Sequence, residues 1–323
     1  MKPKNSRTRI PSPPAKRREP LPWQKPKPAA EDAGAPARLK AILSSASYRK
    51  ADEDISFLDG DEARGPRLQL DYLKAEVRLT ARGIKHTIVV FGSTRILEPI
   101  AAKRRVRALE KAFSRKKNDK TLRARLATAK RILAKSRFYD IAREFGRLVS
   151  QSGAECPDRR LVVMTGGGPG IMEAANRGAF DCGAESIGLN ISLPNEQYPN
   201  PYITPDLCFL FRYFALRKLH FLHRARALVA FPGGYGTLDE LFEALSLIQT
   251  RMIKPLPVIL VGRDYWQKAF DVDFLVEEGT IDAEDRDLIW FAESAAEIWD
   301  GILHWYEAAG EPLCPTPSKS ADH

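Results

Sequence analysis

Long apolar runs and closely spaced cysteines are absent from this chain of 323 residues. No stretch of 18 apolar residues occurs, so we expect no membrane span, and the amino terminus has no apolar core of a secretory signal. The four cysteines are widely spaced and form no C-x-x-C pair, which favours reduced thiols over a disulfide or zinc framework. These absences predict a cytoplasmic protein with no membrane contact and no bound metal.

Two common nucleotide-binding signatures are also missing. The chain has no G-x-x-x-x-G-K-[ST] sequence, the loop that holds the phosphates of a nucleoside triphosphate. A G-x-G-x-x-G match that begins at Gly166 fails because Ile171 takes the last glycine position. No acidic residue ends the next apolar run, at 187–191, where a nicotinamide enzyme needs one for a ribose hydroxyl. We therefore expect no cofactor and a ligand smaller than a dinucleotide, such as a monophosphate.

The positive charge of the chain is confined to two segments. The formal net charge is +10, yet residues 1–40 carry +8 and residues 98–137 carry +12, which leaves −10 for the rest. The acidic remainder argues against nucleic-acid binding by the core. Residues 98–137 are rich in Ala, Leu, Arg and Lys, and a break near 118–119 predicts a helical hairpin. Two interpretations of it stay open: a solvated insertion packed on the domain or a neighbouring subunit, and a weak RNA- or polyanion-binding surface.

Composition divides the chain into four parts. Residues 1–40 are rich in proline and basic residues and have no periodic apolar face, which predicts a disordered tail. Residues 41–83 predict a helical extension. We expect residues 84–310 to form one nucleotide-monophosphate-binding domain that contains the basic insertion, and residues 311–323 to form a C-terminal tail.

Strand patterns alternate with helical patterns through the predicted domain. The expected strands are 84–91, 161–164, 186–191, 228–231 and 258–261. The expected helices are 138–151, 169–181, 211–225, 238–250, 265–277, 285–289 and 295–306. This alternation predicts an α/β fold with a doubly wound, Rossmann-like parallel sheet flanked by helices, in which ligands bind at the carboxyl ends of the strands.

Glycine-rich bends follow three of these strands. Their sequences are P-G-G-Y-G-T at 232–237, T-G-G-G-P-G at 165–170 and G-S-T-R at 92–95. Glycines let bare backbone approach a ligand, and a helix N-terminus offers unpaired N–H groups and a positive dipole end. The bends predict a nucleotide or sugar-phosphate site, although tight strand-to-helix turns alone also use glycine. The binding candidates in them are Gly92, Ser93, Gly166, Gly167, Gly168, Gly170, Gly233, Gly234, Gly236 and Thr237.

Two of these bends resemble the motifs of one family. The sequence P-G-G-Y-G-T-L-D-E at 232–240 fits P-G-G-x-G-T-x-x-E, and G-G-G-P-G-I-M at 166–172 is similar to G-G-G-x-x-G-[LI]-M with one residue fewer between its glycines. Arg217 and Lys218 stand where an Arg-Lys pair precedes the second motif. Over residues 84–275 the chain resembles the LONELY GUY family of cytokinin-activating nucleoside 5′-monophosphate phosphoribohydrolases, in its longer bacterial form. Members of this family were long labelled lysine decarboxylases.

The resemblance implies an enzyme that hydrolyses the N-glycosidic bond of an adenosine 5′-monophosphate, often N6-modified, to free base and ribose 5-phosphate. It also implies that Arg217 and Glu240 are the catalytic pair, that Lys218 assists binding, and that the protein is a homo-oligomer, a dimer or larger. Breaking this bond puts positive charge on the ribose ring, which a carboxylate can stabilise and an arginine can help to orient. The residues alone leave the role of each partner open.

Simpler interpretations stay open for several of these residues. Thr237 and Glu240 have the spacing of a capping box, which needs no catalysis. Glu173 and Asn176 lie three residues apart on one helix face, where they either contact ribose or base or are plain helix-surface residues. Arg217 taken alone is compatible with the surface of a helix.

A second class of function is the alternative. Similar folds with glycine-rich bends occur in molybdenum-cofactor carriers, which bind a nucleotide-like ligand without hydrolysing it, but the pair Arg217 and Glu240 speaks against a pure carrier. Lysine decarboxylation has the least support, because nothing in the chain marks a Schiff-base lysine for pyridoxal phosphate. The physiological base and any hormone role stay open.

Overall fold

The computed structural model describes residues 19–155, 160–194 and 198–313. The chain divides into two compact units, Met1–Arg67 and Leu68–His323. Among the described residues, no helix is both long and apolar enough to cross a lipid bilayer. Most of the predicted C-terminal tail and the first 18 residues of the predicted N-terminal tail lie outside the described residues.

The first unit contains short helices, namely η1 (Pro22–Gln24), α1 (Ala35–Leu43), η2 (Ala46–Tyr48), α2 (Ile55–Asp59) and η3 (Asp61–Ala63). The Asp54 side chain caps α2 by accepting a hydrogen bond of 3.3 Å from the Phe57 N–H. Helix α1 crosses residue 40, the boundary predicted for the tail, and buries no residue. The division of this region into tail and helical extension stays a prediction.

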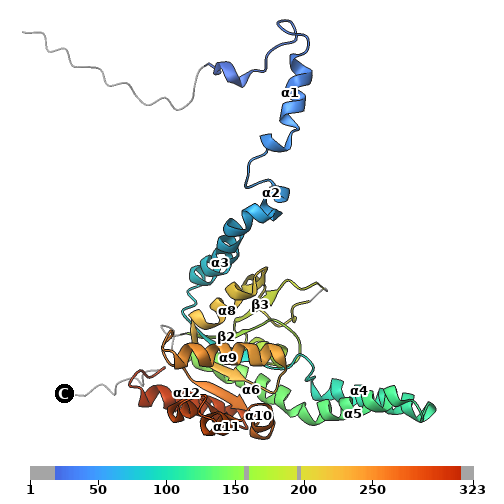
Figure 1. The fold of residues 1–323 in the computed structure, drawn as a ribbon, viewed down its shortest axis with the longest axis vertical. Coiled ribbons are helices and arrows are strands. Elements are labelled where there is room, and N and C mark those ends of the chain that lie inside the picture. Colours follow the sequence, from blue (N-terminus) through green and yellow to red (C-terminus); the bar gives the residue numbers. More distant parts are fainter. Residues whose placement is uncertain (1–18, 156–159, 195–197, 314–323) are drawn as a thin grey trace, which may run out of the picture. The chain divides into compact units, whose positions relative to one another are not determined.

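The second unit is built on a sheet of seven parallel strands in the order β4-β3-β2-β1-β5-β6-β7. The strands are β1 (His86–Phe91), β2 (Leu161–Thr165), β3 (Ser186–Ile191), β4 (Cys208–Phe211), β5 (Ala225–Ala230), β6 (Val258–Val261) and β7 (Trp290–Ala292). Helix α3 (Arg64–Ala81) begins in the first unit and continues into the second. The other helices are α4 (Pro99–Arg115), α5 (Lys120–Lys135), α6 (Arg137–Glu155), α7 (Ile171–Asp181), α8 (Phe214–His223), α9 (Tyr235–Gln249), α10 (Arg263–Ala269), α11 (Val272–Glu277) and α12 (Ala295–Ala308), with the short turns η5 (Pro205–Leu207) and η6 (Ala283–Leu288). The predicted α/β fold with a doubly wound, Rossmann-like sheet is confirmed (Figure 1).

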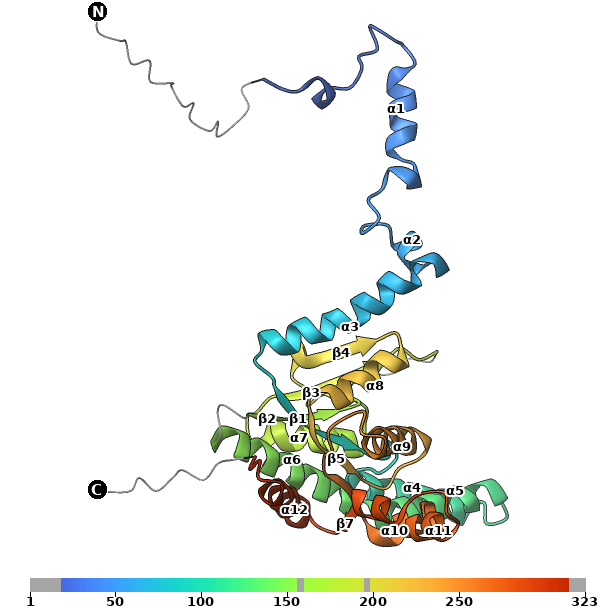
Figure 2. The same ribbon diagram turned by 60° about the vertical axis from the view of Figure 1, so that its left-hand side comes forward.

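Helices cover both faces of this sheet, as two views of the ribbon show (Figure 2). Side chains of α6, α7 and α12 form one buried cluster with the strand residues that face them, such as Val90. Side chains of α3, α8, α9 and α10 form the other, which includes the neighbouring Val89. Successive strand residues point to opposite faces, so a strand covered on both sides needs apolar residues on both, as β1 has from Ile88 to Phe91.

Five elements differ from those expected from the sequence. Strands β4 and β7 were not predicted; they are short and lie at the two edges of the sheet. The helix expected at 211–225 begins at Phe214, because Phe211 belongs to β4 and the next two N–H groups donate to the Asp71 carboxylate. The helix expected at 265–277 is two helices, since Asp271 caps α11 through the Phe274 N–H, and the one expected at 285–289 is the 3-10 turn η6.

The basic insertion forms the predicted helical hairpin. Helices α4 and α5 lie side by side in both views (Figures 1 and 2). Asp119 caps α5 by accepting a hydrogen bond of 2.9 Å from the Leu122 N–H, and Lys130 of α5 forms an ion pair of 2.9 Å with Glu110 of α4. This ion pair joins the two helices at their surface, while Val106 of α4 and Ala129 of α5 are buried.

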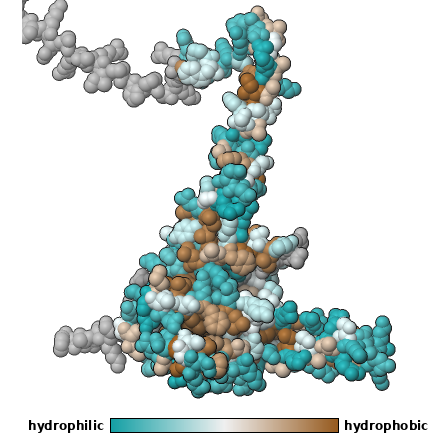
Figure 3. Space-filling view, viewed as in Figure 1, coloured by the Kyte–Doolittle hydropathy of each residue, from teal (hydrophilic) through white to brown (hydrophobic). Residues whose placement is uncertain are grey.

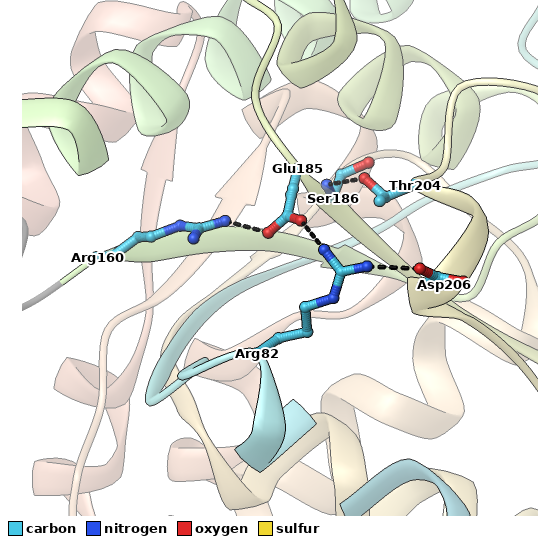
Figure 4. Close-up of polar contacts among 6 residues, drawn as sticks. All are labelled: Arg82, Arg160, Glu185, Ser186, Thr204 and Asp206. Carbon is cyan, nitrogen blue, oxygen red and sulfur yellow. Dashed lines mark hydrogen bonds and ion pairs between the residues drawn. The ribbon is translucent and has the colours of Figure 1, made fainter. Parts of the chain in front are cut away.

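A charged network fixes the amino-terminal end of β3 (Figure 4). Arg82, just after α3, pairs with Glu185 at 2.8 Å and with Asp206 at 2.5 Å. Arg160 pairs with the other oxygen of Glu185. Because these residues precede their strands, the network lies at the edge of the sheet opposite the glycine-rich bends.

Candidate active site

A cavity of about 670 Å³ lies at the carboxyl ends of β1 and β5. From β1 the chain adds strands on one side of the sheet up to β4, and from β5 it adds them on the other side. Ligands of open α/β sheets bind at this switch point, beside the carboxyl ends of the two neighbouring strands. The volume is within the range of small-molecule sites. The wall consists of Phe91, Gly92, Ser93, Thr94, Arg95, Ile96, Ile132, Lys135, Met172, Phe214, Arg217, Pro232, Gly233, Gly234, Tyr235, Gly236, Thr237, Asp239, Glu240 and Tyr265.

The bend after β5 presents the N-terminus of α9 to this cavity. The N-cap residue of α9 is Gly234, which has no side chain to accept a hydrogen bond from the first turn. Thr237 is already inside the helix, where its N–H donates to the Gly234 carbonyl at 2.9 Å. The capping-box interpretation of Thr237 and Glu240 is therefore wrong, because neither residue caps the helix. The uncapped end leaves backbone N–H groups and a positive dipole end for an anionic ligand.

Glu240 is a nearly buried carboxylate in the cavity wall. Only 6% of its side chain is exposed, and its Oε1 lies 4.0 Å from Nη1 of Arg217. Burial raises the pKa of Glu240 to about 7, against the lowering effect of Arg217 and Lys218. A buried carboxylate whose pKa is moved close to neutrality is typical of functional sites. Burying an ionisable group destabilises the fold, and a carboxylate with a purely structural role gains nothing in return.

Arg217 is fixed from several sides. Its Nε donates to the Leu189 carbonyl at 2.7 Å, and its guanidinium lies 5.0 Å from the ring centre of Phe221. A Cβ atom at Gly166 would stand 2.5 Å from Nη2 of Arg217, so the first glycine of the upstream bend makes room for this side chain. Burial lowers the pKa of Arg217, and the carboxylate of Glu240 opposes that effect. Arg217 is therefore not a surface helix residue.

The bend after β2 supports the site more than it lines it. Gly170 has a φ of +74°, and a Cβ there would lie 2.4 Å from the Ser93 carbonyl oxygen. This close approach lets the Ile171 N–H donate to the same carbonyl at 3.2 Å and joins the bend to the β1 loop. The cavity wall includes Met172 from this segment but none of its glycines, Gly166, Gly167, Gly168 and Gly170.

Asn176 is the centre of a buried polar network and does not line the cavity. It is fully buried, and its Oδ1 accepts from the hydroxyl of Thr165 at 2.7 Å and from Nδ2 of Asn200 at 3.0 Å. Its own Nδ2 donates to the hydroxyl of Ser186 at 3.0 Å. These bonds link α7 to β2 and β3, so the side chain holds the bend after β2 in place.

Glu173 and Lys218 are also absent from the cavity wall. Glu173 accepts a hydrogen bond of 2.8 Å from the hydroxyl of Tyr139. Lys218 pairs with Asp239 at 2.8 Å and with Glu243 at 3.3 Å, and it lines a second cavity between α8 and α9. The structure thus gathers Gly92, Ser93, Arg217, Gly233, Gly234, Gly236, Thr237 and Glu240 around one cavity and leaves the other predicted side chains outside its wall.

Several wall residues were not among the predicted ones. Tyr265 donates a hydrogen bond from its hydroxyl to the Gly233 carbonyl and so braces the bend. It lies in the first turn of α10, just beyond the carboxyl end of β6, and the carboxyl-edge rule that located the three bends also points to this segment. Ile132 and Lys135 come from the basic hairpin, and no sequence signal relates them to the bends.

Comparison with known proteins agrees with this geometry. The family model described as "Possible lysine decarboxylase" matches residues 172–302. The protein named cytokinin riboside 5′-monophosphate phosphoribohydrolase LOG3 of Arabidopsis thaliana is 30% identical over 188 residues, 56% of this chain and 82% of that protein. The probable cytokinin riboside 5′-monophosphate phosphoribohydrolase LOG4 of rice (Oryza sativa subsp. japonica) is 31% identical over 150 residues, 45% of this chain and 64% of that protein. The match thus spans less than two thirds of the rice relative.

A solved structure, the molybdenum cofactor binding protein from Rippkaea orientalis, aligns with a TM-score of 0.37 and 23% identity over 51% of this chain and 85% of that one. This likeness is too loose to favour either function. The identity of 30% across 82% of the Arabidopsis protein is decisive for the family. Together with the two glycine-rich bends and the Arg217–Glu240 pair, it establishes that this chain belongs to the LONELY GUY (LOG) family.

Proposed function

We propose that this protein hydrolyses the N-glycosidic bond of adenosine 5′-monophosphate, N6-modified or not, or of a related nucleoside monophosphate. The products are the free base and ribose 5-phosphate. The names of the relatives support this reaction class. The observation that carries the proposal is Glu240, a nearly buried carboxylate with a pKa of about 7 that faces Arg217 across 4.0 Å beside an uncapped helix N-terminus.

The geometry of α9 suits a ribose 5-phosphate. The phosphate binds at the glycine-rich N-terminus, where N–H groups and the helix dipole favour an anion. Glu240 follows the N-cap residue Gly234 by six positions, and an α-helix rises about 1.5 Å per residue, so the Cα atom of Glu240 lies about 9 Å along the axis from that of Gly234. That separation leaves room for a ribose ring between the phosphate and the carboxylate.

The chemistry then follows from where charge develops. As the bond between C1′ and the base breaks, the ribose ring gains oxocarbenium character. The carboxylate of Glu240 stabilises that positive charge, and water adds to C1′ while the base leaves with the bonding electrons and is protonated. Arg217, held by the Leu189 carbonyl, keeps Glu240 oriented and favours its ionised form.

The test is to incubate the purified full-length chain with adenosine, cytidine, guanosine and uridine 5′-monophosphates and an N6-isopentenyl adenosine 5′-monophosphate, and to measure ribose 5-phosphate. We expect release from at least one adenosine monophosphate and its loss in Glu240→Gln. Tight binding of these nucleotides without release of any ribose 5-phosphate would instead indicate a carrier.

A further inference from the structure

The basic hairpin stands with both of its ends at the candidate active site. The chain leaves β1 at Phe91, and the residues that lead to α4, from Gly92 to Ile96, line the cavity. It returns along α5, whose last turn adds Ile132 and Lys135 to the wall. The hairpin, which the family motifs do not cover, therefore forms one side of the cavity.

The position of Lys135 is set by a firmly packed junction. The next residue, Ser136, is buried, and its hydroxyl donates to the Leu133 carbonyl at 2.7 Å. Phe138 packs so closely on Gly262 that a Cβ there would lie 2.7 Å from the ring. Tyr139 is 1% exposed and donates to Glu173 of α7. The backbone that carries Lys135 is thus tied to the core within a few residues.

Among the cationic side chains of this cavity, Lys135 is half-buried and has no carboxylate partner within the described part of the chain. Arg217 faces Glu240, and Arg95 is exposed to solvent. Among the residues that the structure describes, Lys135 forms no ion pair, whereas Lys130 on the same helix is paired with Glu110. A half-buried ammonium that lines a cavity without a carboxylate partner is suited to an anionic ligand.

We propose that Lys135 binds the 5′-phosphate of the substrate together with the N-terminus of α9, which lines the same cavity. The inference rests on the proposed function for the class of substrate. The helix end offers only partial charges to a phosphate dianion, and Lys135 supplies a full positive charge. The acidic wall residues Asp239 and Glu240 lie farther along α9, on the side assigned to the ribose.

The experiment measures equilibrium binding of adenosine 5′-monophosphate and of adenosine to the full-length chain by calorimetry, with kcat and KM measured alongside. Lys135→Met keeps most of the length of the unbranched side chain and removes the charge. We expect it to weaken binding of the monophosphate about tenfold or more and to leave adenosine binding unchanged. Lys135→Arg, which keeps the charge, should retain most of the affinity for the monophosphate.

Lys120→Met is the matched control, since Lys120 is an exposed lysine at the far end of the same helix. An equal loss in that variant, an equal loss for adenosine, or unchanged monophosphate binding in Lys135→Met would each overturn the inference. A wild-type protein that binds adenosine 5′-monophosphate without hydrolysing it would overturn the proposed function alone, because the binding measurements would still decide the role of Lys135.

Discussion

Replacing Glu240 with glutamine is expected to stabilise the folded protein while it removes the proposed activity. Glutamine has the shape of the neutral acid and cannot ionise. The carboxyl is 6% exposed, and burial raises its pKa from an ordinary value of 4.5 to about 7. A group whose pKa is higher in the folded than in the unfolded state stabilises the fold fully only below pH 4.5, and this contribution is lost as pH rises through 7.

The magnitude follows from the two pKa values. The difference between 4.5 and about 7 corresponds to about 3 kcal/mol at a pH well above 7. Glu240→Gln should therefore exceed the wild type in free energy of unfolding by about 3 kcal/mol at pH 8.5, narrowing to about 1 kcal/mol at pH 5.5. Urea denaturation followed by tryptophan fluorescence at both pH values measures this gap.

Glu76→Gln provides a control of opposite sign. The hydrogen bond from Arg224 lowers the pKa of Glu76, so this carboxylate stabilises the fold at neutral pH and above. Its replacement should reduce the free energy of unfolding at pH 8.5. A Glu240→Gln protein that is less stable than the wild type at pH 8.5, or a gap that does not change with pH, would refute the assignment of Glu240 as a strained, buried acid.

Three further predictions concern the glycine-rich bend, assembly and the tail. Gly236 lines the cavity, and a Cβ atom added to it would meet open space, so Gly236→Val should fold normally yet bind adenosine 5′-monophosphate at least tenfold more weakly. Gly65 is equally open, and the control variant Gly65→Val should bind the nucleotide like the wild type; equal affinity in both variants would argue against a phosphate at this bend. Exposed apolar side chains lie on the face that carries α8 and α9 (Figure 3), and we expect two or more copies of the protein to associate through this face. Light scattering should give the mass of at least a dimer, which Leu219→Glu on α8 dissociates and Ile100→Glu on α4 does not. A monomeric wild type would contradict this prediction. Deleting residues 1–34 should leave kcat/KM for a nucleoside monophosphate within about twofold, and a tenfold loss would show that this segment reaches the site.

The main features of the site were accessible from the sequence for a simple reason. Parallel strands end at one edge, so the bends after β1, β2 and β5 had to meet, and these strands are neighbours in the sheet. The edge strands β4 and β7 were not predicted because they have only four and three residues, respectively. So short a segment shows too little periodicity to separate a strand from a helix.

Other features depended on side-chain contacts that spacing does not encode. Asn176 follows the glycine bend by one helical turn, which is equally compatible with a ligand contact and with the core network that it forms with Thr165 and Ser186. Lys135 is one of 15 basic residues between 98 and 137, and composition treats them alike. What distinguishes it is its place in the cavity wall, next to the fixed junction at Ser136 and Phe138.

The most direct test of the central claim is the rate of ribose 5-phosphate release from adenosine 5′-monophosphate by the wild type and by Glu240→Gln between pH 6 and pH 8.5. If the ionised carboxylate acts on the ribose, wild-type kcat/KM rises with pH and levels off above about pH 7, the pKa of Glu240. The Glu240→Gln substitution should lower the rate about 100- to 1000-fold and abolish that rise. Turnover by the variant equal to that of the wild type would contradict the account.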